Sequence, residues 1–186
     1  MACLPEALEL TRPGGPDGER AIDDGGPSIL VMGHTPDEGL EAAVSEGIRI
    51  SIFDLHQAEL LSGAARELGK TARAHLKIDT GMNRLGIKPD SGTPALIERI
   101  ASLPGLEIEG VFTHLALVDA DSDRRQFDLF MDVVGAAEAR GLRFAYRHVC
   151  DSLGLARYPE FRLDLVRPGA ILYGARPTRA PLADGM

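Results

Sequence analysis

Residues that could take part in acid–base or anion chemistry stand directly after apolar stretches of this sequence. They are Lys77 and Asp79, His114, Asp151 and Ser152, and Arg167. A histidine or a lysine of shifted pKa can carry a proton, and a hydroxyl or an arginine can hold an anion. Parallel α/β sheets build their sites where the strands end, so these residues would meet at one edge of such a sheet.

Lysine is scarce in this chain, which narrows the search for a reactive amine. Of the 20 basic residues only three are lysines, namely Lys70, Lys77 and Lys88. In the stretch 73–79, RAHLKID, polar and apolar residues alternate, so in a barrel strand Lys77 would point to the interior. There the amine would have to be paired, neutralised or chemically modified. At a partly hydrated sheet edge it would be a solvated lysine.

Arg84 and His114 are further candidates, each with a plain alternative. Arg84 lies in the loop sequence DTGMNRLGI between Gly81 and Gly86, where tight turns would bring it over the same sheet edge. A solvated arginine is the alternative. His114 could carry a proton, act as a ligand or orient another group, although from the pattern alone a hydrogen-bonded structural histidine is favoured. The histidines lack metal-ligand spacing, so no metal site is predicted.

The stretch after residue 150 offers groups that could hold an anion. Asp151 and Ser152 stand where a strand turns into a short helix, and free N–H groups with a hydroxyl suit a phosphate. A helix N-cap without further function is the alternative. Arg167, Gly169 and Ala170 belong to a second loop, and two such loops side by side form the usual phosphate site of a barrel.

The elements that would position these residues alternate between strand and helix. Strands are predicted at 28–33, 49–53, 72–79, 107–114, 143–149 and 163–173, and helices at 35–46, 54–68, 92–102, 122–140 and 152–157. Such alternation implies βαβ units and a parallel sheet. A complete (β/α)8 barrel has eight strands and about 250 residues, so six strands predict an open doubly wound sheet or an incomplete barrel. Polar groups at successive strand ends, and the lack of a G-x-G-x-x-G turn, favour the barrel.

Two of the predicted helices begin with N-terminal signals. Thr35 precedes a proline and stands three residues before Glu38, and Asp54 stands three residues before Gln57. Both patterns are typical of capping boxes, in which the first side chain accepts a backbone hydrogen bond. We therefore expect Thr35 and Asp54 to be N-caps.

Composition and charge disfavour several classes of partner. The 186 residues have a net charge of −8 with both signs interspersed, which argues against nucleic acid and anionic membranes. The chain has no apolar run of 18 residues and no basic n-region of a signal peptide. Cys3 and Cys150 lie far apart, so no disulfide framework is expected and a cytoplasmic location is predicted. Residues 11–27, rich in Gly, Pro and Asp, read as a flexible loop.

Four motifs resemble those of alanine racemases in order and spacing. They are HLKIDTGMNRLGI (75–87), GVFTHLA (110–116), HVCDSLG (148–154) and VRPGAILYG (166–174). The resemblance implies an α/β fold, a pyridoxal phosphate (PLP)-binding (β/α)8 TIM-type barrel, here incomplete with about six of its eight strands. It also implies interconversion of L- and D-alanine, which supplies D-alanine for peptidoglycan, a small amino-acid substrate and a homodimer.

The resemblance assigns roles to individual residues. Lys77 matches a lysine that is often carbamylated in this family, and a carbamate there would orient Arg84, which matches an arginine near the phenolic oxygen of the cofactor. His114 matches a histidine beside the cofactor. The predicted cofactor-binding residues are Arg167 at the pyridine nitrogen, Ser152 with the N–H groups of Gly169 and Ala170 at the phosphate, and Asp151, where many relatives have asparagine.

The sequence also departs from the family pattern. It has no V-V-K-A-N-A-Y-G-H-G-like motif with the Schiff-base lysine, and it lacks the catalytic tyrosine and the C-terminal β-domain. The chain is expected to begin near the end of the second barrel strand, at residues 2–7. The predicted layout is a remnant strand or helix with the loop over 1–27, a partial barrel domain over 28–177 and a tail over 178–186. We expect the chain alone to be inactive. Alternatives are a serine or broad-specificity racemase, a non-catalytic PLP-binding barrel, and an inert fragment.

Overall fold

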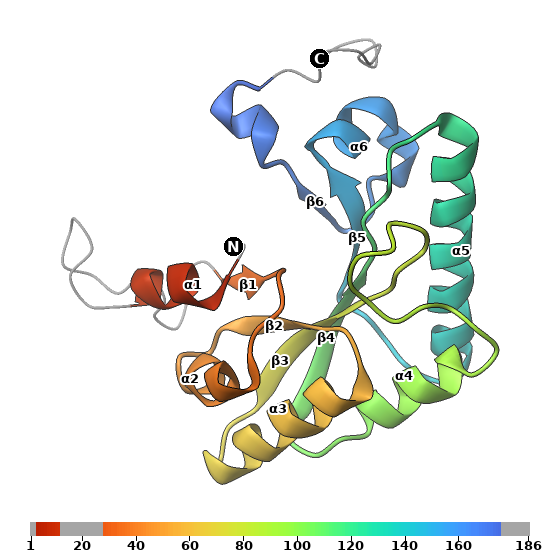
Figure 1. Cartoon of the computed structure of the whole chain (residues 1–186). Coiled ribbons are helices and arrows are strands. Elements are labelled where there is room, and N and C mark those ends of the chain that lie inside the picture. The colour runs from red at the N-terminus through yellow and green to blue at the C-terminus, as the bar shows by residue number, and fades with distance from the viewer. Residues whose placement is uncertain (1–2, 12–27, 176–186) are drawn as a thin grey trace. The chain divides into compact units, whose positions relative to one another are not determined.

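A computed structural model describes residues 3–11 and 28–175 of the chain. The chain divides into two compact units, one formed by residues 1–76 and 99–108 and the other by residues 77–98 and 109–186. The described residues form a six-stranded sheet whose order, β1-β2-β3-β4-β5-β6, follows the sequence (Figure 1). The predicted number and succession of strands are thus confirmed.

The first unit contains the N-terminal half of the elements. These are α1 (Leu4–Thr11), β1 (Leu30–Val31), the 3-10 helix η1 (Asp37–Gly39), α2 (Leu40–Ser45), β2 (Arg49–Ile52), α3 (Leu55–Glu67) and most of β3 (Ala72–Lys77). Strand β2 pairs in parallel with both β1 and β3. Its apolar residues are fully buried, as expected for a central parallel strand with both faces covered.

The second unit contains the elements that carry the candidate residues. The first part of α4 (Thr93–Ala101) and the second part of β4 (Leu106–Phe112) belong to this unit, and the rest of both elements belongs to the first unit. The rest are α5 (Ala120–Ala139), β5 (Tyr146–Asp151), α6 (Ser152–Arg157), η2 (Pro159–Phe161), β6 (Leu165–Arg167) and η3 (Ala170–Tyr173). Strand β5 pairs in parallel with β4 and β6. Helix α5, the long helix of this unit in Figure 1, buries a stripe that includes Phe130, Val134 and Ala137, as its sequence predicts.

The predicted cap of α3 is confirmed, but that of the preceding helix is wrong. Asp54 accepts a hydrogen bond from the backbone N–H of Gln57 at 2.8 Å. Thr35 is not the N-cap: a short 3-10 helix precedes α2, and the buried hydroxyl of Thr35 has no hydrogen-bond partner among the described residues. Its carbonyl accepts from the side chain of Gln57 at 3.4 Å, and the N-cap position of the 3-10 helix is taken by Pro36.

The ends of the described chain also differ from the prediction. Residues Leu4–Thr11 form helix α1, where we expected the end of the second barrel strand or a remnant helix; no strand is formed at these residues. The last strand is limited to Leu165–Arg167, because Pro168 has no N–H to donate and a 3-10 helix begins at Ala170. The loop predicted at 11–27 and the tail predicted at 178–186 lie, except for Thr11, outside the described residues.

Two features of the described residues bear on membrane insertion and on disulfide bonding. Within residues 3–11 and 28–175, no helix combines the length and apolar character needed to cross a membrane. Cys3 and Cys150 are both free thiols, and Cys150 is buried.

Candidate functional site

Lys77, at the end of β3, is a buried amine. Its side chain is only 5% exposed, which excludes the solvated alternative. The ammonium donates to the carbonyl of Ile78 at 3.0 Å and lies 5.8 Å from the ring centre of Phe112. Burial lowers the pKa of Lys77 to about 8, although nearby Asp79 raises it and the charges of Arg167 and Arg84 lower it further. Lys77 can therefore lose its proton close to neutral pH.

The loop after β3 is folded back against the strand that precedes it. Asp79 accepts hydrogen bonds from the backbone N–H groups of Gly81 and Asn83, at 3.2 and 2.9 Å. Ile87 donates to the carbonyl of Lys77 and accepts from the N–H of Asp79, each at 2.9 Å. A side chain at Gly86 would lie 2.9 Å from the carbonyl oxygen of Lys77, so only glycine permits this approach.

Arg84 lies in this loop and is exposed. Within the described part of the chain, no hydrogen bond or ion pair holds its guanidinium. Its positive charge nevertheless lies near enough to lower the pKa of both Lys77 and His114. The structure thus brings Arg84 into the electrostatic surroundings of these two groups without fixing its position.

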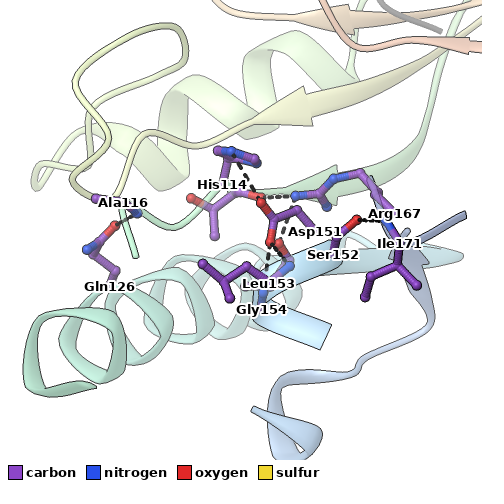
Figure 2. Close-up of polar contacts among 11 residues, drawn as sticks. His114, Ala116, Gln126, Asp151, Ser152, Leu153, Gly154, Arg167 and Ile171 are labelled. Atoms are coloured by element: carbon purple, nitrogen blue, oxygen red, sulfur yellow. Dashed lines mark hydrogen bonds and ion pairs between the residues drawn. The ribbon is translucent and has the colours of Figure 1, made fainter. Parts of the chain in front are cut away.

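His114 follows β4 and faces Asp151, at the end of β5 (Figure 2). Its Nε2 lies 3.9 Å from a carboxylate oxygen of Asp151. Burial lowers the pKa of His114, the charge of Arg167 lowers it further, and Asp151 raises it. The other oxygen of Asp151 accepts from the N–H groups of Leu153 and Gly154, at 3.0 and 2.8 Å. One carboxylate therefore caps α6 and pairs with the histidine.

Arg167, in β6, is held by three acceptors. It donates to the carbonyls of Thr113 and Val149, at 2.9 and 2.7 Å, and lies 2.8 Å from Nδ1 of His148. The ring of His148 stacks on Phe112 with 4.6 Å between ring centres. Burial lowers the pKa of Arg167 to about 10, while Asp151 and Cys150 raise it, so the guanidinium stays cationic at neutral pH.

A cavity of about 340 Å³ lies at the carboxyl ends of β5 and β6. Its walls are Asp151, Ser152, Leu153, Arg167, Gly169, Ala170 and Ala175. The hydroxyl of Ser152 accepts from the N–H of Ile171 at 3.3 Å (Figure 2), and the N–H of Gly169 donates to the carbonyl of Arg167 at 2.9 Å. All five residues predicted to bind a cofactor thus line one cavity.

The structure adds residues that the sequence did not single out. His148 and Phe112 support Arg167, and Gln126 of α5 accepts from the N–H of Ala116, beside His114. A signal existed for Gln126, because it is a polar residue on the apolar stripe of an amphipathic helix, four residues before Phe130. No group of three or more potential metal ligands occurs among the described residues.

A sheet of consecutive parallel strands with polar groups gathered at their carboxyl ends defines the barrel-type class of α/β proteins. The family model for the N-terminal domain of alanine racemase matches residues 1–177. The chain is 40% identical over 153 residues to an alanine racemase of Desulfovibrio desulfuricans, covering 81% of this chain and 41% of that protein. The alanine racemase of Clostridium tetani is 34% identical over 181 residues, covering 96% and 44%. The chain therefore belongs to the alanine racemase family.

Solved structures agree with this assignment. An alanine racemase of Clostridium difficile, in complex with cycloserine, superposes with a TM-score of 0.86 and 30% identity over 95% of this chain and 46% of that one. The enzyme from Streptomyces coelicolor A3(2) gives a TM-score of 0.80, also at 30% identity, over 95% of this chain and 46% of that one. The predicted fold, an incomplete barrel of this family, is confirmed. The chain spans less than half the length of each of these four relatives.

Proposed function

We propose that this chain supplies the cofactor-holding part of a PLP-dependent racemase that interconverts L- and D-alanine. The observation that carries this proposal is the cavity at the ends of β5 and β6, which has the half-buried guanidinium of Arg167 on one wall and the hydroxyl of Ser152 on another. A planar cationic fork beside an anion-binding hydroxyl suits a ligand with an aromatic nitrogen and a phosphate. Membership of the alanine racemase family supports this choice of ligand.

The residues of the cavity wall are compatible with the cofactor. Arginine has five N–H groups, and the three acceptors around Arg167 leave others for the pyridine nitrogen. Because a cationic donor would face that nitrogen, the nitrogen would remain unprotonated. Ser152 and the N–H of Ala170 would hold the phosphate, while the N–H of Gly169 would first have to leave the carbonyl of Arg167. When bound, PLP supplies an electron sink for negative charge on the substrate carbon that has lost a proton.

Three groups of this chain would act around the bound cofactor. With its pKa lowered to about 8, Lys77 has a fraction of uncharged amine near neutral pH; its nitrogen could bond to the carbon of carbon dioxide and release a proton to solvent, and the resulting carbamate would orient Arg84. His114, with its pKa lowered by burial, would lie neutral beside the cofactor at pH 7, with a carboxylate oxygen of Asp151 3.9 Å from its Nε2. The carboxylate of Asp151 adds a negative charge at the cavity wall, which would weaken the hold on a phosphate.

Racemisation itself is proposed for the longer protein rather than for this chain alone. The described residues hold no acid–base pair on opposite sides of the cavity, and the relatives are more than twice as long as the matched region. We propose that the complete enzyme acts as a homodimer in the cytoplasm and supplies D-alanine for the cell wall. The substrate would be a small amino acid, with alanine favoured over serine by the family.

Titration of the full chain with PLP tests the proposed cofactor site. Wild type should bind PLP, and Arg167→Gln should weaken binding at least about tenfold, because the variant removes the cationic wall of the cavity. Arg140→Gln is the matched control, since Arg140 pairs with Glu98 on the surface, away from the cavity walls. Equal dissociation constants for wild type and Arg167→Gln would contradict the proposed site.

Incubation of the chain with PLP and L-alanine tests the second part of the proposal. No D-alanine should be detected by chiral chromatography with this chain alone. Turnover by the isolated chain would show that it contains its own pair of catalytic bases. It would contradict the proposal that this chain holds the cofactor while racemisation needs the longer protein. Ser152→Ala, a milder change than Arg167→Gln, should weaken PLP binding less and serves as a second variant of the cavity wall.

A further inference from the structure

Gln126 is a buried side chain of α5 that contacts two loops of the second unit. It is 5% exposed. Its Oε1 accepts a hydrogen bond from the N–H of Ala116 at 3.0 Å (Figure 2), and its Nε2 donates to the hydroxyl of Ser122 at 3.2 Å. Its Cγ and Cδ lie so close to Gly81 that a Cβ built there would be 3.0 Å from both. Gln126 thus supports the loops after β3 and β4 together.

The two loops that meet at Gln126 carry His114 and Arg84. Ala116 comes two residues after His114, and Gly81 comes three residues before Arg84. The hydroxyls of Thr80 and Thr113 are hydrogen-bonded at 2.8 Å and join the same two loops directly. Movement of either loop would therefore displace both candidate groups.

The loop after β4 holds a strained residue at the point where Gln126 binds it. Leu117, next to Ala116, has φ of 56°, in the left-handed region that residues other than glycine rarely adopt. Such a conformation persists only when the surrounding structure holds it in place. Here the N–H of Ala116 is bound by Gln126, and the carbonyl of Leu117 accepts from Arg157 at 3.4 Å. Without Gln126 we expect Leu117 to leave the left-handed region and the loop after β4 to move.

We propose that Gln126 is a positioning residue, which fixes the loops after β3 and β4 so that His114 stays against Asp151 and Arg84 stays near it. The proposal rests on the proposed function only in treating His114 and Arg84 as working groups of the site. Its physical content is independent of any ligand. An amide is suited to the task, because one oxygen and one nitrogen satisfy an N–H donor and a hydroxyl acceptor in a buried place.

The chain offers a matched control in the first unit. Gln57 of α3 is 3% exposed, its Oε1 accepts from the N–H of Phe53 at 3.1 Å, and its Nε2 donates to the carbonyl of Thr35 at 3.4 Å. It therefore binds the end of β2 much as Gln126 binds the loop after β4. Neither Phe53 nor Thr35 is a candidate for chemistry. Loss of Gln57 should cost stability without touching His114.

The test is a nuclear magnetic resonance titration of the His114 ring in the ligand-free full chain. Gln126→Leu should raise the pKa of His114 towards its ordinary value, because a loosened loop exposes the ring to water and burial is the main cause of its lowering. Asp151, Arg167, Arg84 and Lys77 are the charged groups that act on this ring. Gln57→Leu should leave the titration unchanged while lowering the unfolding midpoint by a similar amount.

Two further variants keep the proposal open to refutation if Gln126→Leu does not fold. Gln126→Glu keeps an oxygen acceptor, so the amide resonance of Ala116 should stay near its wild-type position. Gly81→Ala places a Cβ 3.0 Å from Cγ and Cδ of Gln126 and should move the titration of His114 in the same direction as Gln126→Leu. An unchanged His114 titration in Gln126→Leu, or in Gly81→Ala where the former is unfolded, would reduce Gln126 to a structural role. Because no cofactor is added, this result is separate from the test of PLP binding.

Discussion

The strand ends of the two units are built by the same local devices but carry different side chains. After β2, Asp54 caps α3 and Gln57 binds the backbone of Phe53. After β4, Asp119 accepts from the N–H of Ser122 at the start of α5, and Gln126 binds the backbone of Ala116. A capping carboxylate and a buried amide thus end the strand and start the helix in both units. These devices therefore serve folding, and the chemistry of each strand end depends on the side chains that stand beside them.

In the first unit the exposed ring of His34 lies 6.3 Å from that of Phe53, whereas in the second unit several partly or fully buried ionisable side chains stand at the strand ends. The end of β2 presents Phe53 and the hydroxyl of Ser51, which donates to the carbonyl of Val31 at 2.8 Å. The second unit presents Lys77, His114, Asp151 and Arg167 at its strand ends, and burial lowers the pKa of three of these four residues. Perturbed groups that share one cavity or its surroundings are typical of functional sites.

The largest expected difference between the units is in how much a glycine-to-alanine substitution changes the free energy of unfolding. Gly86→Ala should lower the free energy of unfolding by about 3 kcal/mol or more, because the new Cβ would meet the backbone of Lys77 and Asp79 at a φ of 124°. Gly63→Ala, in the interior of α3 with nothing within 4 Å of a Cβ, should raise it by up to about 1 kcal/mol. Urea denaturation measures both. A small loss in Gly86→Ala would show that the loop after β3 is not held as closely as the structure indicates.

Lys77 should destabilise the folded chain at neutral pH, unlike the exposed lysine of the first unit. Its pKa is about 8 in the folded state and 10.5 in the unfolded state. Below pH 8 the amine is therefore charged in both states, and burial of this charge lowers the free energy of unfolding. Between those values the unfolded chain binds the extra proton, and stability rises with pH. Lys77→Met should therefore raise the free energy of unfolding by about 2 kcal/mol at pH 7, a figure that already allows for the loss of one hydrogen bond. This stabilisation should disappear as the pH approaches 10.5.

Denaturation at several pH values checks this prediction. Lys70→Met is the control, because the exposed amine of Lys70 donates to the carbonyl of Ser45 and its loss should bring no gain at pH 7. If Lys77→Met were as stable as wild type at pH 7, the amine would have to be charged and fully compensated, or already modified. Mass spectrometry of the intact chain in the presence of bicarbonate would distinguish these two.

Much of the fold could be predicted from sequence because its signals are local. The cap at Asp54, the apolar stripe of α5 and the glycine that ends α3, Gly69 with φ of 61°, each act within one or two turns of helix. The cap predicted at Thr35 failed because a 3-10 helix with Pro36 at its N-cap precedes α2, and the capping pattern does not reveal this turn. The last strand is shorter than predicted, because an apolar run does not reveal where hydrogen bonding to the neighbouring strand stops.

The candidate site could be predicted in its residue types but not in its bonds. The position of Lys77 and Arg167 at strand ends follows from alternation and from motif order. The acceptors that hold Arg167 lie 18, 19 and 54 residues away, on Val149, His148 and Thr113, and no local pattern connects them. The roles of Lys77, Arg84, His114 and the cavity residues stay predictions. What the structure contributes is that most of them lie close enough to affect one another's charge.

A smaller effect should show how alike the two units are in their capping. Asp54→Ala and Asp119→Ala each remove an N-cap bond of 2.8 Å, and each should lower the free energy of unfolding by about 1 kcal/mol. The two losses should agree within about 0.5 kcal/mol, as measured by urea denaturation. A much larger loss for Asp119→Ala would mean that its carboxylate does more than cap, and the parallel between the units would fail.

The smallest change in stability, and the sharpest test of the comparison, is expected for Asp151→Asn. Asparagine is also a good N-cap, so the amide oxygen can still accept from Leu153 and Gly154, and the free energy of unfolding should change by less than about 0.5 kcal/mol. The pKa of His114 should nevertheless fall further, because Asp151 is the negative charge that raises it. Ring titration by nuclear magnetic resonance measures this fall. Asp119→Asn, the matched change at the start of α5, should leave His114 unchanged, because Asp119 is not among the charges that act on it. If both variants moved His114 alike, the effect would come from the cap and not from the charge, and the distinction between folding device and working group would not hold at Asp151.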